Sequence, residues 1–182
     1  MIIHINGAPG SGKTTIGSKL KSVLGPKVVV CDLDDLFREY MGASKFTVKG
    51  YQAFINKFIT ACRRRGHSIV FVGLNREHLT SHIYDVSADH KFWLDISVEQ
   101  ILQRHFIREL TGWLNWMRGR DAHILFNQLC ADEKGVTRDL KASLGRVLSL
   151  SKQRKFIKSF KSAEHEKLSP DQTFQRVITL LR

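Results

Sequence analysis

The sequence predicts an α/β fold in which helices cover both faces of a parallel sheet. Short, almost wholly apolar runs alternate along the 182-residue chain with longer segments whose apolar residues recur every three or four positions. Runs of the first kind are typical of strands buried on both sides, and segments of the second kind are typical of amphipathic helices. Strands that alternate with helices form a parallel sheet between two helical layers.

Four apolar runs are predicted to be the strands of this sheet, namely residues 1–6, 27–31, 68–72 and 90–96. A fifth strand near Phe160 is a further candidate. Polar or glycine-containing connections follow the four runs: the loop from Gly7, the segment from Asp32, the turn at Gly73 and the region after Asp95. Because ligands of parallel sheets bind beyond the carboxyl ends of the strands, we expect these connections to surround one site.

Four segments are predicted to be helices: the one that carries Ile16 and Leu20, residues 48–65, the segment from Ser97, and the segment capped by Ser169-Pro170-Asp171-Gln172. In the second of these, a stripe of Phe54, Ile55, Phe58, Ile59 and Cys62 is expected to face the core. Residues from about 111 to 161 are polar, basic and poor in strand signals. We interpret them as a helical lid inserted into a single domain that spans residues 1–182.

Residues 7–14 form a complete G-x-x-x-x-G-K-[ST] phosphate-binding loop. Its glycines let backbone N–H groups point at phosphate oxygens, and the helix that follows presents its positive end to the same anion. Lys13 adds a cation near the β- and γ-phosphates, and the Thr14 hydroxyl can ligate Mg²⁺. The sequence therefore predicts a three-layer P-loop NTPase fold. ATP would be bound by Gly7, Ala8, Pro9, Gly10, Ser11, Gly12, Lys13, Thr14 and Thr15.

Three carboxylates follow the second strand in the sequence Asp32-Leu33-Asp34-Asp35. A carboxylate at this strand end can hold Mg²⁺ or accept the proton of an attacking hydroxyl. We expect Asp32 to be catalytic and to bind the metal with Thr14, Asp34 to be catalytic and to contact the acceptor, and Asp35 to contact the acceptor. One of the three can instead cap the following helix, and Asp35 can equally be solvated.

These segments resemble the nucleoside monophosphate kinases, most nearly adenylate kinase, within the group that includes shikimate and gluconate kinases. Residues 35–38, Asp-Leu-Phe-Arg, are similar to the family's G-D-x-L-R segment, and residues 73–76, Gly-Leu-Asn-Arg, to its D-G-F-P-R turn. The resemblance implies that Arg38 and Arg76 bind a phosphate of the acceptor. Val72 departs from the family's aspartate, and Asp32-x-Asp34 is more like the shikimate kinases, whose paired carboxylates hold Mg²⁺ and an acceptor hydroxyl.

Residues 97–108 resemble the helix that leads into the family's lid and ends in an R-x-x-x-R pair. Arg104 and Arg108 lie one helical turn apart, so both guanidinium groups can reach one polyphosphate. We expect them to be catalytic because a stabilising arginine can contribute strongly to phosphoryl transfer. Surface ion pairs with Glu99 or Glu109 are the alternative.

The predicted function is ATP- and Mg²⁺-dependent transfer of the γ-phosphoryl group to a nucleoside monophosphate or a nucleotide-like small molecule. One alternative is a polynucleotide 5′-hydroxyl kinase. The other is a non-catalytic nucleotide-binding regulatory protein whose basic lid docks nucleic acid or a partner. The net charge of +12 favours polyanionic partners, but clusters such as Arg63-Arg64-Arg65 can equally be solvated helix faces. Nucleic acid is therefore not the favoured partner.

Composition supports an ordinary globular protein, with 42% apolar and 25% charged residues. No apolar run approaches the roughly 20 residues of a membrane span, and no targeting segment is recognised, so a cytoplasmic location is expected. Cys31, Cys62 and Cys130 are isolated along the chain. Free thiols in a reducing compartment are the expected reading.

Overall fold

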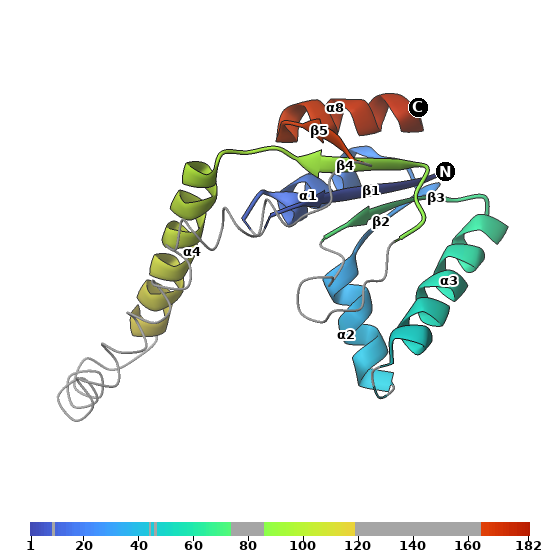
Figure 1. The fold of residues 1–182 in the computed structure, drawn as a ribbon, viewed down its shortest axis with the longest axis horizontal. Coiled ribbons are helices and arrows are strands. Elements are labelled where there is room, and N and C mark those ends of the chain that lie inside the picture. Colours follow the sequence, from blue (N-terminus) through green and yellow to red (C-terminus); the bar gives the residue numbers. More distant parts are fainter. Residues whose placement is uncertain (9, 44, 46, 74–85, 119–164) are drawn as a thin grey trace. The chain divides into compact units, whose positions relative to one another are not determined.

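The computed structural model describes residues 1–8, 10–43, 45, 47–73, 86–118 and 165–182. It contains a five-stranded parallel sheet in the order β2-β3-β1-β4-β5 (Figure 1). The strands are β1 (Ile2–Gly7), β2 (Val28–Asp32), β3 (Ser68–Val72), β4 (His90–Leu94) and β5 (Glu166–Leu168). Every neighbouring pair is parallel, so the carboxyl ends of all five strands lie at one edge.

Helices cover both faces of this sheet, as the sequence predicts. The described helices are α1 (Lys13–Val23), α2 (Leu33–Ala43), α3 (Val48–Arg64), α4 (Val98–Arg118) and α8 (Pro170–Leu181). Alternate residues of β1 divide between two cores, with Ile2 in the core of α2 and α3 and Ile3 and Ile5 in the core of α1 and α8. This division is the period-two pattern of a strand buried on both sides. The α/β three-layer architecture is confirmed.

The apolar stripe predicted for residues 48–65 faces the core in α3. Ile55, Ile59 and Cys62 are buried, while Phe54 and Phe58 are partly buried and pack against the same core. The helix starts at Thr47, whose side chain accepts a hydrogen bond from the Gly50 backbone N–H. The helical period of the apolar residues therefore located both the element and its buried face.

The fifth strand lies at Glu166–Leu168, whereas the sequence suggested one near Phe160, which is outside the described residues. The strand is short and begins with two charged, exposed residues, so it lacks the apolar run that marks a central strand. It pairs with β4, placing Lys167 opposite Trp93. The helix after it has the expected cap, since Ser169 and Gln172 form a reciprocal capping box.

The chain divides into two compact units, one of residues 1–96 with 161–182 and the other of residues 97–160. The first unit holds the sheet, and the described part of the second is Ser97 with α4. Because α4 extends to Arg118, the start of the predicted lid at residue 111 lies within a continuous helix. Residues 119–161 of that lid lie outside the described residues. No helix in the described ranges is long and apolar enough for a membrane span.

Candidate active site

The phosphate-binding loop connects β1 to α1 at the carboxyl edge of the sheet. Gly10 and Gly12 have φ angles of 81° and 99°, a backbone region that side chains other than glycine rarely adopt. The Asn6 side chain accepts a hydrogen bond of 2.8 Å from the Gly7 backbone N–H, and the Ser11 N–H donates to the Ala8 carbonyl at 3.0 Å. The strand–loop–helix context required by the motif is therefore present.

The Lys13 ammonium lies inside this loop. Its Nζ donates hydrogen bonds to the carbonyls of Gly7 at 2.7 Å and Ala8 at 2.8 Å. Burial lowers the pKa of Lys13 from its ordinary 10.5 to about 8, and this effect outweighs the opposing attraction of Asp34 and then of Asp32. A partly buried cation that contacts two carbonyls and is attracted by two carboxylates is a suitable partner for a polyphosphate.

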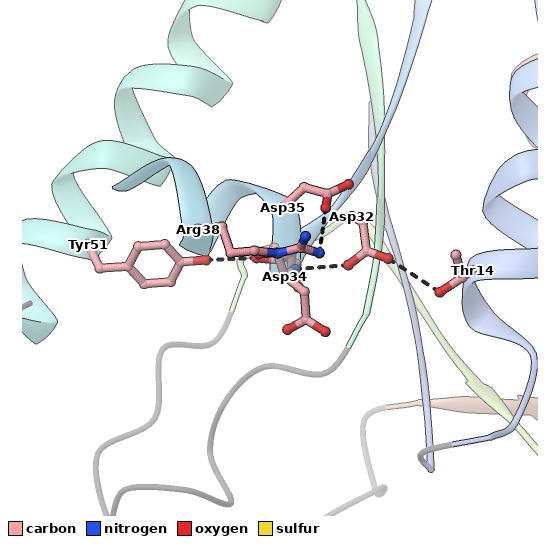
Figure 2. A network of polar contacts seen from close by, with 7 residues as sticks. Thr14, Asp32, Asp34, Asp35, Arg38 and Tyr51 are labelled. Atoms are coloured by element: carbon pink, nitrogen blue, oxygen red, sulfur yellow. Dashed lines mark hydrogen bonds and ion pairs between the residues drawn. The ribbon is translucent and has the colours of Figure 1, made fainter. Parts of the chain in front are cut away.

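Asp32 connects the loop to the start of α2. Its Oδ2 accepts a long hydrogen bond of 3.4 Å from the Thr14 hydroxyl, and its Oδ1 accepts one of 2.9 Å from the Asp34 backbone N–H (Figure 2). Magnesium in phosphate-transfer sites is commonly held by one or two protein oxygens together with phosphate oxygens. Thr14 Oγ1 and Asp32 Oδ2 are such a pair, and no larger cluster of metal-binding side chains occurs among the described residues. This donor set fits Mg²⁺ bound together with a nucleotide.

The neighbouring strand β3 supplies no carboxylate at its end. Val72 is buried in the core below α1, and a Cβ added at Gly17 would lie 3.2 Å from its Cγ2. The following Gly73 has φ 128° and approaches Asp32 so closely that an added Cβ would lie 3.2 Å from Oδ1. Of the described residues, Asp32 is therefore the carboxylate that reaches Thr14.

Asp34, Asp35 and Arg38 lie on the exposed first turns of α2. Arg38 donates to Asp35 Oδ1 at 2.8 Å as an ion pair, and its Nε donates to the Asp34 carbonyl at 3.3 Å. Figure 2 shows the Asp34 carboxylate directed away from this pair. Tyr51 of α3 donates to the Leu33 carbonyl at 3.4 Å and so holds the start of α2. Arg38 is thus not an isolated solvated arginine.

The structure brings together Lys13, Thr14, Asp32 and Asp34, with Asp35 and Arg38 beside them. Arg104 and Arg108 are both exposed on α4, which belongs to the other compact unit. Two further predicted residues, Pro9 and Arg76, lie outside the described residues, as does Cys130. The other two cysteines, Cys31 and Cys62, are free, as expected.

Three contacts around the site were not anticipated from the sequence. Asn6 holds the entry of the loop, Tyr51 holds the start of α2, and His4 Nε2 lies 3.1 Å from the Gly73 carbonyl. His4 is completely buried in β1. The sequence signal for two of these contacts is the presence of His4 and Asn6 within an apolar strand. Buried polar side chains need hydrogen-bond partners, so both residues could have been predicted to form such contacts.

No protein-family model and no curated protein matches the chain. Three solved structures illustrate what it is similar to. An uncharacterized protein from Eubacterium ventriosum is 16% identical (100% of this chain, 98% of that one, TM-score 0.48). Thymidylate kinase from Ehrlichia chaffeensis is 11% identical (100% and 97%, TM-score 0.42), and a Pnkp1/Rnl/Hen1 complex is 23% identical (57% and 38%, TM-score 0.38). These likenesses are distant. The chain's own sheet and loop define its fold, which is the three-layer fold of P-loop NTPases.

We expect the affinity for ADP with Mg²⁺ to fall as pH rises through about 8. An anionic nucleotide favours charged Lys13 and so raises its pKa above the value of about 8 in the free protein. Below this pH the ammonium is charged in both states, and the affinity has its full value. Above it, binding takes up a proton, and the affinity falls by up to about tenfold per pH unit until the pKa of the complex is reached.

Calorimetric titrations at a series of pH values, in buffers of different ionisation enthalpy, measure both the affinity and the proton uptake. The Lys13→Met variant serves as the control because it lacks the titrating group. An affinity that is constant across the range, with no proton uptake, would contradict this prediction.

Proposed function

We propose that this protein is an ATP- and Mg²⁺-dependent kinase that transfers the γ-phosphoryl group to a nucleoside monophosphate or a nucleotide-like small molecule. The observation that carries the proposal is the position of Lys13, whose Nζ contacts the loop carbonyls of Gly7 and Ala8 and whose charge is attracted by Asp34 and Asp32. A protein that only held a nucleotide with Mg²⁺ would need the loop and one metal-binding carboxylate, Asp32, but not the further carboxylate of Asp34. Phosphoryl transfer needs both a phosphate cradle and groups that orient an acceptor.

Each group of described site residues has a separate role in this reaction. The loop N–H groups and Lys13 bind the β- and γ-phosphates, and Thr14 and Asp32 hold the metal ion. Bound Mg²⁺ would neutralise charge on the phosphates. An acceptor oxygen attacks the γ-phosphorus while the bond to the β–γ bridging oxygen breaks, so ADP leaves. Little covalent help is needed, which agrees with a site built from charges rather than from a nucleophile.

Arg38 is suited to bind an acceptor that already carries a phosphate. Two of its N–H groups are engaged by Asp35 and the Asp34 carbonyl, and an arginine offers five. The contact with Asp35 holds the guanidinium in place while other donors stay available. Since both side chains are largely exposed, this ion pair contributes little stability, and its value lies in orientation.

A second candidate, transfer to a hydroxyl group such as the 5′-hydroxyl of a polynucleotide, is favoured by Asp34. Of the two carboxylates that raise the pKa of Lys13, Asp34 has the larger effect. Its negative charge therefore acts close to the place where a γ-phosphate would bind. A hydroxyl acceptor must lose a proton that a carboxylate can accept, whereas an acceptor phosphate is already anionic and would be repelled. For a hydroxyl acceptor, Asp34→Asn should lower kcat by about 10²- to 10⁴-fold without a comparable change in KM for ATP.

ADP production from ATP with Mg²⁺ distinguishes these candidates when each acceptor is tested in turn. The set comprises ribo- and deoxynucleoside monophosphates, nucleosides, shikimate, gluconate and a 5′-hydroxyl oligonucleotide. We expect one nucleoside monophosphate to stimulate turnover well above background hydrolysis. If only a hydroxyl compound stimulates turnover, the nucleoside monophosphate kinase is refuted and transfer to a hydroxyl group is supported. A uniform lack of stimulation, with ATP still bound, would refute a kinase and leave a nucleotide-binding protein.

A further inference from the structure

The outward face of α3 carries positive charge without any compensating acid. No aspartate or glutamate occurs between residues 45 and 65, while six cations do, and all six are exposed: Lys45, Lys49, Lys57, Arg63, Arg64 and Arg65. The four acids among residues 1–73 all lie between residues 32 and 39, at the end of β2 and in α2. The surface of α3 therefore carries one sign of charge, whereas ordinary soluble surfaces mix the two signs.

Three of these cations lie along one side of the helix. At 100° per residue, Lys49, Lys57 and Arg64 fall within an arc of about 80°, and they are spread over about 22 Å of the helix axis. The opposite side of α3 packs on the sheet through Ile55 and Ile59. We call Lys49, Lys57 and Arg64 the α3 basic face.

Within the part of the chain that the structure describes, these three side chains form no ion pair and no hydrogen bond. Their charge is thus available to a partner. A row of unneutralised cations of this length is suited to a polyanion, because each phosphate contact releases a counterion.

The other exposed residues of α3 indicate which kind of polyanion this face can bind. A helix that binds an anionic membrane needs large apolar residues to insert, but the residues between the cations are Gln52, Ala53, Asn56 and Thr60. The aromatic rings of Phe54 and Phe58 pack against the core, so they are not available to stack on bases. Contacts from this face would therefore be to phosphates alone.

We propose that the α3 basic face binds the sugar–phosphate backbone of nucleic acid without reading its sequence. The core that α3 forms is on the opposite face of the sheet from α1, so this binding does not require an occupied phosphate loop. The inference goes beyond the proposed kinase activity and does not depend on which acceptor the enzyme uses. Binding through the α3 basic face would keep the protein on nucleic acid, whichever small molecule the enzyme phosphorylates.

The test is fluorescence anisotropy with a labelled DNA duplex of arbitrary sequence and with one of its strands, over a range of salt concentrations. For the triple variant Lys49→Gln/Lys57→Gln/Arg64→Gln, we expect affinity at low salt to fall at least about tenfold. The slope of log K against log[salt] should become shallower by about 2 to 3, because each lost phosphate contact removes roughly one unit. Glutamine is a good helix former, so the unfolding temperature should not change.

The matched control is Lys19→Gln/Arg176→Gln/Arg182→Gln, which removes the same charge from exposed positions on α1 and at the end of the chain around α8. Equal losses in both triples would mean that net charge alone is responsible and would overturn the proposal. Wild-type protein that binds phosphatidylserine vesicles but no nucleic acid would overturn it as well. Lys13→Met should bind the duplex normally, which separates this proposal from the fate of the kinase assignment.

Discussion

Replacing Lys13 by methionine is expected to lower turnover by about 10³-fold or more while leaving the protein folded. The ammonium is positioned by the carbonyls of Gly7 and Ala8 and would exchange them for the phosphates of the nucleotide. A preorganised donor of positive charge in a partly buried site typically contributes this much to the rate. Steady-state ADP production measures the loss, and Lys19→Met, an exposed position on the same helix, is the control that should retain activity.

The same variant should be at least as stable as the wild type in the absence of nucleotide. The pKa of Lys13 is about 8 in the folded protein and ordinarily 10.5, so between these values the unfolded chain binds more protons. Lys13 therefore makes the free energy of unfolding rise with pH across this window, and below about pH 8 its charged side chain costs the free protein stability. Burial raises the pKa of the Cys31 and Cys62 thiols above the ordinary 9.0, which opposes this rise from about pH 9 in both proteins. Denaturant titrations should therefore show the wild type gaining stability relative to Lys13→Met as the pH rises above about 8. A variant with wild-type turnover would refute the assigned role.

Replacing Asp32 by asparagine is expected to raise the Mg²⁺ concentration needed for half-maximal activity by about 10- to 100-fold, the usual cost of weakening a metal site. Asparagine keeps an oxygen that can accept the Asp34 backbone N–H, so the start of α2 is preserved while the charge beside Thr14 is lost. Activity should recover in part at high Mg²⁺. Magnesium titrations of the initial rate measure this shift.

The matched control for this variant is Asp35→Asn, which removes an equal charge three residues along the chain. Asp35 pairs with Arg38 rather than with Thr14, so the Mg²⁺ requirement should be unchanged. Any effect of this variant should be a change in the KM for the acceptor. A similar Mg²⁺ shift in both variants would indicate a general loss of negative charge. That result would contradict a specific metal role for Asp32.

Much of the fold is predictable from the sequence because its signals are local. Residues 68–72 are a strand with the predicted bounds, and the stripe in α3 faces the core as expected. The cap at Ser169 and the phosphate loop are likewise encoded by adjacent residues. The short strand β5 at Glu166–Leu168 was not predicted because pairing with β4, not its own apolar content, makes it a strand.

The grouping of the site, by contrast, is a property of the tertiary structure. Apolar runs show that strands exist, but not that β3 lies between β1 and β2 or that their carboxyl ends align. That alignment places Asp32 beside Thr14 and puts Val72 in the core where the resemblance would have an aspartate. The pair of Arg38 with Asp35 is local by contrast, because residues three positions apart meet on one side of α2.

The sequence by itself therefore determined the phosphate loop, the alternation of strands and helices, and the supply of carboxylates after the second strand. Only the tertiary structure decided which carboxylate approaches Thr14, how far burial lowers the pKa of Lys13, and that the α3 basic face forms no ion pair among the described residues. The reason is physical. Local patterns depend on residues within a few positions of one another, whereas proximity, burial and charge balance depend on residues that the chain brings together from a distance.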